Sequence, residues 1–160
     1  MAINILVVED DPVQVELIAK IFKNSEYDYK WAPDVERAKA LLAARFFSAI
    51  LCDLNISGYK DGFELMRWIR DRDGIRDIPI IMITASANAD TVMMARSIGI
   101  QGFLVKPFQP RALLKVLALT QASGQKRRVG TRTKIASTDE LRERMAQRQA
   151  ESEKDESDLP

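Results

Sequence analysis

Short apolar runs alternate along the first 120 residues with segments whose apolar positions recur at helical spacing. Each run is short, apolar and followed by polar or turn-forming residues, which is typical of a buried strand. The predicted strands cover residues 3–8, 27–31, 49–52, 79–83 and 102–105. Strands that alternate with helices in this way predict an α/β fold, with a parallel sheet covered by helices on both faces.

The helical segments between the strands show one apolar face each. Apolar positions recur at Leu17, Ile18, Ile21 and Phe22, which predicts that these side chains line the inner face of a first helix. Similar stripes predict a second and a third helix around residues 38–42 and 63–69, and two more helices are predicted over 88–98 and 109–119.

Composition adds bounds to this picture. The chain has 160 residues and a formal net charge of +1, so its bulk charge favours neither nucleic acid nor an acidic partner. No apolar run is long enough to span a membrane, and the N-terminus shows no signal-peptide pattern. The single cysteine, Cys52, cannot form an internal disulfide. We therefore expect a cytoplasmic protein with a buried, structural thiol.

The character of the chain changes after Leu119. Residues 126–134 are rich in lysine and arginine, and residues 151–158 are mostly acidic. These features predict a compact domain over 1–120 and a charged, flexible tail over 121–160 with a possible helix at 138–149. The tail is too short and too polar for a DNA-binding output domain, so we expect output through protein partners.

Chemically active side chains follow four of the predicted strands. Glu9 and Asp10 follow the first strand, Asp53 the third, Thr84 the fourth and Lys106 the fifth. Right-handed crossovers place the carboxyl ends of parallel strands at one edge of the sheet, where ligands bind in open α/β folds. We therefore expect these side chains to lie close together.

The absence of histidine narrows the chemistry of this predicted site. A general base, a zinc ligand or a phosphodonor of the histidine type is excluded. Crowded carboxylates repel one another unless protons or a cation neutralise them, and an oxygen-only ligand set favours Mg²⁺. Asp53 could then accept a phosphoryl group while Lys106 offsets charge and Thr84 donates a hydrogen bond to the transferring oxygens.

Four motifs in this order resemble a receiver domain of a two-component response regulator. They are the acidic turn at 7–12, the acceptor Asp53, the hydroxyl-bearing strand end at 83–85 and the lysine-proline turn at 103–108. The resemblance covers about residues 2–120. It implies a doubly wound, flavodoxin-like sheet of five strands in the order 2-1-3-4-5, and a lysine-proline peptide bond that is usually cis.

The resemblance also implies a role for each site residue. Asp10 and Asp53 would bind Mg²⁺ directly together with the backbone carbonyl of Asn55, and Glu9 would bind it through water. Asp53 would take a phosphoryl group from a phosphohistidine of a sensor histidine kinase or a phosphotransfer protein. The chain would catalyse only its own phosphorylation and dephosphorylation.

A conformational switch is implied as well. Thr84 and Phe103 would move together and change the face formed by helix four, strand five and helix five. This face would bind a downstream protein or support a phosphorylation-dependent dimer. Phe103 stands where the family often has tyrosine, so packing alone would have to drive its rotation. Ser57-Gly58 departs from the family's usual loop, which carries a proline there and is one residue shorter.

Other functions fit less well. Within the receiver class, a phosphorelay intermediate or a phosphate sink stays open. A haloacid-dehalogenase-like phosphatase needs a second aspartate where Asn55 stands. A nucleotide-binding Rossmann domain needs a glycine-rich turn where the chain has acids. The basic run at 126–134 has no interleaved aromatic residue, which argues against a nucleic acid partner.

Overall fold

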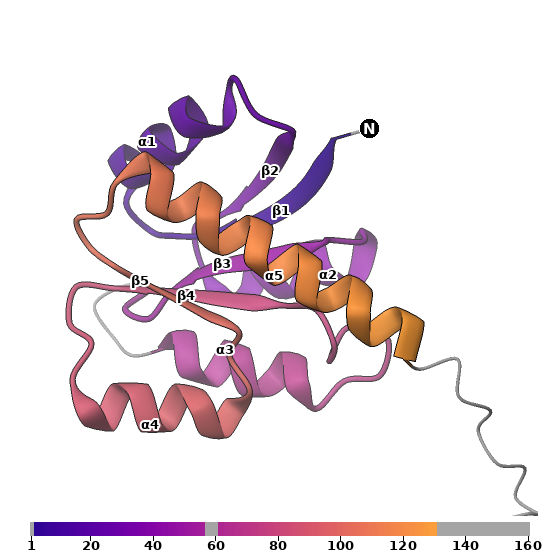
Figure 1. Ribbon diagram of the computed structural model, residues 1–160. Helices are drawn as coiled ribbons and strands as arrows, with labels where there is room; N and C mark the ends of the chain where they lie inside the picture. The colour runs from indigo at the N-terminus through magenta and orange to yellow at the C-terminus, as the bar shows by residue number, and fades with distance from the viewer. Residues whose placement is uncertain (1, 57–60, 131–160) are drawn as a thin grey trace, which may run out of the picture. The chain divides into compact units, whose positions relative to one another are not determined.

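The sheet confirms the predicted architecture. The computed structural model describes residues 2–56 and 61–130. Within them, five parallel strands pair in the order β2-β1-β3-β4-β5 (Figure 1). The strands are β1 (Ile3–Val8), β2 (Tyr27–Ala32), β3 (Ala49–Asp53), β4 (Ile80–Thr84) and β5 (Gly102–Val105). This is the doubly wound, flavodoxin-like fold that the sequence predicted.

Each crossover passes through a helix. The helices are α1 (Pro12–Phe22), α2 (Val35–Ala44), α3 (Asp61–Arg70), α4 (Ala89–Ile98) and α5 (Pro110–Gly130). Three begin at a side chain that accepts a backbone N–H of the first turn, namely Asp11 in α1, Asp34 in α2 and Asn88 in α4. Gly99 ends α4 in the left-handed region at φ 82°, a conformation that costs glycine little.

The sheet separates two apolar layers. Alternate residues of β1 enter different layers, Val7 on the side of α1 and α5 and Leu6 on the side of α2, α3 and α4. Phe22 and Leu117 contribute to the first layer and Met66 to the second. In Figure 1, α5 crosses in front of the sheet and α2 lies behind it. Because both faces are covered, the central strands can present reactive groups at their ends and not along their length.

Two details differ from the expectation. In α1, Leu17 is 42% exposed, while Val15 is buried. The inner face passes through Val15, Ile18 and Phe22, at the three- and four-residue spacing of one helical stripe. The last helix, expected to end near Leu119, continues to Gly130. The segment 120–130 contains no proline, and its alanine, glutamine, lysine and arginine favour helix although Gly124 does not, so the helix can continue beyond the apolar stripe.

Several expectations concern other parts of the chain. The possible helix at 138–149 and the Ser57-Gly58 departure lie outside the described residues. Residues 1–124 form one compact unit, and the boundary at residue 120 stays a prediction. Among the described residues, no helix combines the length and apolar character that a membrane span requires.

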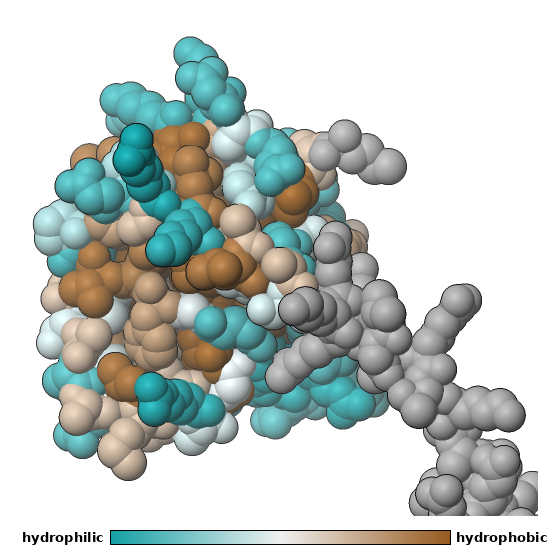
Figure 2. All heavy atoms as spheres, viewed as in Figure 1, coloured by the Kyte–Doolittle hydropathy of each residue, from teal (hydrophilic) through white to brown (hydrophobic). Residues whose placement is uncertain are grey.

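Apolar and hydrophilic side chains are interspersed on the surface that Figure 2 shows, where α5 lies in front. Large apolar side chains that remain exposed include Val13 on α1, Met93 on α4, Val105 on β5 and Leu119 on α5.

Candidate phosphoryl-acceptor and metal site

Glu9 lies in the turn after β1 and is held at each of its polar groups. Its backbone N–H donates to the Ala32 carbonyl at 3.1 Å, which extends the β1–β2 pairing by one residue. One carboxylate oxygen accepts the Lys106 ammonium at 2.9 Å, and the other accepts the Asp11 amide at 3.2 Å. The side chain is 2% exposed. Glu9 is therefore a fixed, buried carboxylate.

Asp53 is the last residue of β3, so its side chain leaves the sheet at the carboxyl edge. Oδ2 accepts the Lys106 ammonium at 3.0 Å, and Oδ1 accepts the Asn55 amide at 3.1 Å. The Leu54 amide donates to the Ile83 carbonyl at 2.9 Å, which fixes the chain just beyond the strand. The carboxylate is thus oriented by hydrogen bonds on both oxygens.

Lys106 joins the two acids across the edge of the sheet. Its backbone N–H donates to the Thr84 carbonyl at 2.8 Å, so pairing of β4 and β5 places the residue. The Lys106–Pro107 peptide bond is cis, as the resemblance implied. The ammonium bridges residues that are 97 and 53 positions away in the sequence. The structure thus brings Glu9, Asp53 and Lys106 together as predicted.

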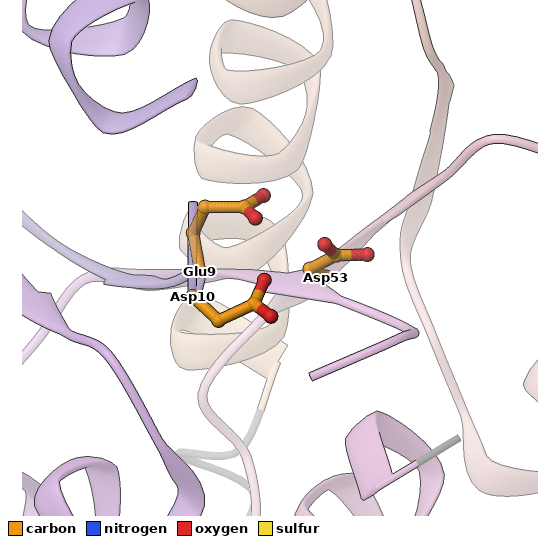
Figure 3. Close-up of side chains that lie close together, drawn as sticks. All are labelled: Glu9, Asp10 and Asp53. Atoms are coloured by element: carbon orange, nitrogen blue, oxygen red, sulfur yellow. The ribbon is translucent and has the colours of Figure 1, made fainter. Parts of the chain in front are cut away.

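Asp10 completes a cluster of three carboxylates. Glu9, Asp10 and Asp53 each offer an oxygen, and these oxygens all lie within 4.8 Å of one another. Figure 3 shows the three side chains close together. Three carboxylates facing one ammonium leave a formal charge of −2, and every ligand atom is oxygen. This donor set fits Mg²⁺.

The pKa values reflect the crowding. The pKa of Glu9 is raised from 4.5 to about 7: burial raises it most, the hydrogen bond to Lys106 lowers it, and the nearby charge of Asp53 raises it. Burial acts to lower the pKa of Lys106, but hydrogen bonds to Glu9 and Asp53 outweigh it and raise that pKa above its ordinary value. Lys106 therefore stays an ammonium at neutral pH.

The Cys52 thiol, next to Asp53 in the chain, is expected to be unreactive. Cys52 precedes Asp53 and is completely buried in the sheet, which raises the pKa of its thiol far above the ordinary value. A thiol that stays protonated is a poor nucleophile. The prediction of a structural cysteine fits this environment.

The two predicted switch residues, Thr84 and Phe103, differ in burial. Thr84 is buried, and its hydroxyl donates to the Ser86 carbonyl at 3.0 Å and accepts the Ser86 amide at 3.2 Å. Phe103 is half-buried against the apolar layer under α2, α3 and α4. Asn55 is exposed and touches the site through its backbone amide.

Two residues that support the site were not predicted from the sequence. Gly62, at the start of α3, packs against the end of β3, and a Cβ there would lie 2.5 Å from the Asp53 carbonyl oxygen. The Trp31 indole N–H donates to the Glu9 carbonyl at 2.7 Å from 22 residues away. The Asp61-Gly62 pair in a polar loop could have indicated the first. Nothing local indicates the second, because it depends on the pairing of β1 with β2.

Comparison with known proteins agrees with this geometry. The family model of the response regulator receiver domain matches residues 5–118. The response regulator protein FleR of Pseudomonas aeruginosa is 33% identical over 118 residues, which cover 74% of this chain and 24% of FleR. The chemotaxis protein CheY of the same organism is 28% identical, with 69% of this chain and 89% of CheY covered.

A solved structure supports the same assignment. The chemotaxis protein CheY4 of Vibrio cholerae superposes with a TM-score of 0.70 at 27% identity, covering 75% of this chain and 99% of that one. The matched region spans only about a quarter to a half of the first curated relatives, at 24%, 48% and 25% of their lengths. From its sheet order, its acidic edge and these matches, the chain belongs to the response regulator receiver domain family of two-component signalling.

Proposed function

We propose that this chain is a phosphorylation-controlled switch in which Asp53 accepts a phosphoryl group from a phosphohistidine of a sensor histidine kinase or a phosphotransfer protein. The arrangement of Asp53 carries the proposal. Its carboxylate is oriented by the Lys106 ammonium and the Asn55 amide, and oxygens of Glu9 and Asp10 lie within 4.8 Å of it.

Receiver domains bind Mg²⁺ at an acidic pocket. Here Asp10, Asp53 and the backbone carbonyl of Asn55 would hold the ion directly, and Glu9 would hold it through water. The bound ion would neutralise the excess negative charge and polarise the phosphoryl oxygens. The three carboxylates and the Lys106 ammonium together carry a formal charge of −2. One divalent cation balances this charge, which supports the assignment.

The transfer exchanges one phosphorus bond for another. An oxygen of the Asp53 carboxylate forms the new P–O bond as the P–N bond to the partner's imidazole breaks, and the imidazole leaves with a proton. Lys106 remains charged throughout, because its pKa is raised, and its ammonium offsets charge on the phosphoryl oxygens. We expect no other substrate, so the chain catalyses only its own phosphorylation and dephosphorylation.

The Thr84 hydroxyl supplies the coupling to the surface. A hydroxyl has one proton to donate, and Thr84 gives it to the Ser86 carbonyl. A hydrogen bond to a phosphoryl oxygen must therefore break that contact, which releases the β4–α4 turn to move. Phe103 packs in the layer beneath α4, so a displaced turn leaves space that its ring can fill.

The output face has the exposed apolar side chains that a partner needs. Met93 on α4 is 69% exposed, Val105 on β5 is 47% exposed and Leu119 on α5 is 59% exposed. These residues support binding of a downstream protein, or a phosphorylation-dependent dimer, on the α4-β5-α5 face.

A buried, protonated thiol at Cys52 suits a switch that works in the cytoplasm.

Asp53→Asn tests the acceptor. Acetyl phosphate with Mg²⁺ should label the wild-type chain at one site, as read by intact-mass spectrometry, and labelling should vanish in Asp53→Asn and in excess EDTA. The amide keeps the size of the side chain but lacks the nucleophilic carboxylate. Asp28→Asn, at an exposed position on β2, should label like wild type. Label that persists in Asp53→Asn would show that another residue is the acceptor.

A further inference from the structure

Trp31 makes an unusual contact with the acidic turn. It lies near the carboxyl end of β2, opposite Val7 in the pairing with β1. Its indole N–H donates to the Glu9 carbonyl at 2.7 Å, a short bond for this donor, while 39% of the side chain remains exposed. Packing of the Trp31 ring alone would not require this hydrogen bond to the backbone of the acidic turn.

This bond completes the anchoring of Glu9. The backbone N–H of Glu9 donates to Ala32, and the two carboxylate oxygens accept from Lys106 and the Asp11 amide. The carbonyl is the remaining polar group, and Trp31 occupies it. The end of β2 therefore holds Glu9 through both of its backbone polar groups.

The Glu9 carbonyl belongs to the same planar peptide as the Asp10 nitrogen. A hydrogen bond that fixes the carbonyl also fixes that plane, and with it the position of the Asp10 Cα from which the side chain leaves the turn. Asp10 follows β1, outside the strand pairing that ends at Val8. The position of its carboxylate among the three acids thus depends on the orientation of this peptide.

We propose that Trp31 is a positioning residue for the metal site: its indole N–H orients the Glu9–Asp10 peptide so that the Asp10 carboxylate is held ready for Mg²⁺. The inference rests on the proposed metal-dependent function and adds a residue that touches no ligand atom. Groups that orient metal ligands from outside commonly tune affinity without entering the coordination shell.

Trp31→Phe removes the N–H and keeps an aromatic ring. Titration calorimetry with MgCl₂ should show affinity about two- to tenfold weaker than wild type, the loss expected for one hydrogen bond. The labelling rate with acetyl phosphate at saturating Mg²⁺ should equal that of wild type. In the metal-free protein, the Asp11 amide should exchange faster by NMR, because the turn is less constrained.

Trp68→Phe is the matched control. Trp68 lies on α3, with the Arg72 guanidinium 3.9 Å and the Lys39 ammonium 5.3 Å from its ring. Loss of this indole should leave both the Mg²⁺ affinity and the Asp11 exchange rate at wild-type values. Wild-type Mg²⁺ affinity in Trp31→Phe would overturn the positioning role while leaving the proposed function in place. A wild-type chain that binds no Mg²⁺ would overturn both.

A second variant separates the N–H from the shape of the ring. In the Trp68→Phe background, Trp31 can be replaced biosynthetically by benzothienylalanine, which keeps the bicyclic ring and has sulfur in place of the N–H. Affinity should weaken as in Trp31→Phe. Recovery of wild-type affinity in this protein would assign the effect to ring packing and overturn the proposal. This replacement also answers the question if Trp31→Phe folds poorly.

Discussion

One cationic side chain bridges several elements at each end of the strands. Arg70 lies at the edge formed by the amino ends of the strands, and Lys106 lies at the edge formed by their carboxyl ends. At the amino edge, Arg70 at the end of α3 makes four hydrogen bonds of 2.7–3.0 Å to neutral oxygens before β4 and β5. They come from the carbonyls of Arg76, Ile78 and Gly99 and the side chain of Gln101. The Gln101 oxygen also accepts the Ile80 amide at 2.8 Å, so this joint connects α3, β4 and α4 to the start of β5.

At the carboxyl edge, Lys106 meets carboxylates instead of carbonyls. Its two hydrogen bonds end on Glu9 and Asp53, and Asp10 adds a third acid. Burial raises the pKa of Glu9, and the nearby charge of Asp53 adds to this effect. The difference indicates two uses of a half-buried cation. Arg70 completes a structural joint, whereas Lys106 leaves a charge that a ligand must balance.

Gly62→Ala should cause the largest loss of stability, because it creates a steric clash at the carboxyl edge of the sheet. The new Cβ would lie 2.5 Å from the Asp53 carbonyl and 2.8 Å from two Leu54 backbone atoms, and backbone cannot rotate away. We expect a loss of about 3 kcal/mol in the free energy of unfolding, measured by urea denaturation.

Gly102→Ala is the control at the other edge. A Cβ there would lie 2.7 Å from Cγ2 of Val116, a side-chain atom, and no backbone atom is among the nearest contacts. The loss should be clearly smaller than in Gly62→Ala. Equal losses would contradict the distinction between a backbone clash and a side-chain clash.

Arg70→Met should cost somewhat less, about 2 kcal/mol, because several hydrogen bonds to a charged donor are lost while the apolar stem is kept. Mg²⁺ affinity, measured by calorimetry, should not change, since the joint lies at the opposite edge. Arg72→Met, at a neighbouring position where the guanidinium stacks on Trp68, should cost less than about 1 kcal/mol. A change in Mg²⁺ affinity in Arg70→Met would show that the two edges are coupled.

Glu9→Gln should have the smallest effect on the free energy of unfolding, and the size of this effect should depend on pH. The folded-state pKa of about 7 exceeds the ordinary 4.5, so the folded protein binds this proton more tightly than the unfolded chain. The stabilisation is complete below pH 4.5 and is lost as pH rises to about 7 in Mg²⁺-free buffer. Glutamine removes this dependence, so the variant should exceed wild type at pH 8 by about 1–2 kcal/mol.

The control substitution is made at an acidic residue that is exposed, unlike Glu9. Glu16→Gln changes an exposed residue of α1 that pairs with Lys20 at 3.6 Å, and its stability should follow the wild-type pH profile. Thermal unfolding across pH 4–8 measures all three proteins. A wild-type profile that Glu9→Gln reproduces would contradict the raised pKa.

Sequence patterns predicted much of this molecule because they reflect local physics. Apolar runs and helical stripes located every described strand and helix, and the order of acid, hydroxyl and lysine motifs placed the site at one edge. The stripe in α1 was partly misassigned at Leu17, because both Val15 and Leu17 are apolar and only packing against the sheet selects between them. The end of α5 was missed because an apolar stripe shows where a helix packs and not where it ends.

By itself, the sequence determined the alternation of strands and helices, the oxygen-only chemistry of the acids and the convergence of Asp10, Asp53 and Lys106. These follow from periodicity, residue type and the handedness of crossovers, which act locally or by general rule. Only the tertiary structure decided that Trp31 holds the Glu9 carbonyl, that Gly62 must lack a Cβ and that Thr84 is engaged by Ser86. Such contacts depend on distances of a few tenths of an ångström between segments brought together by strand register, which no single segment encodes.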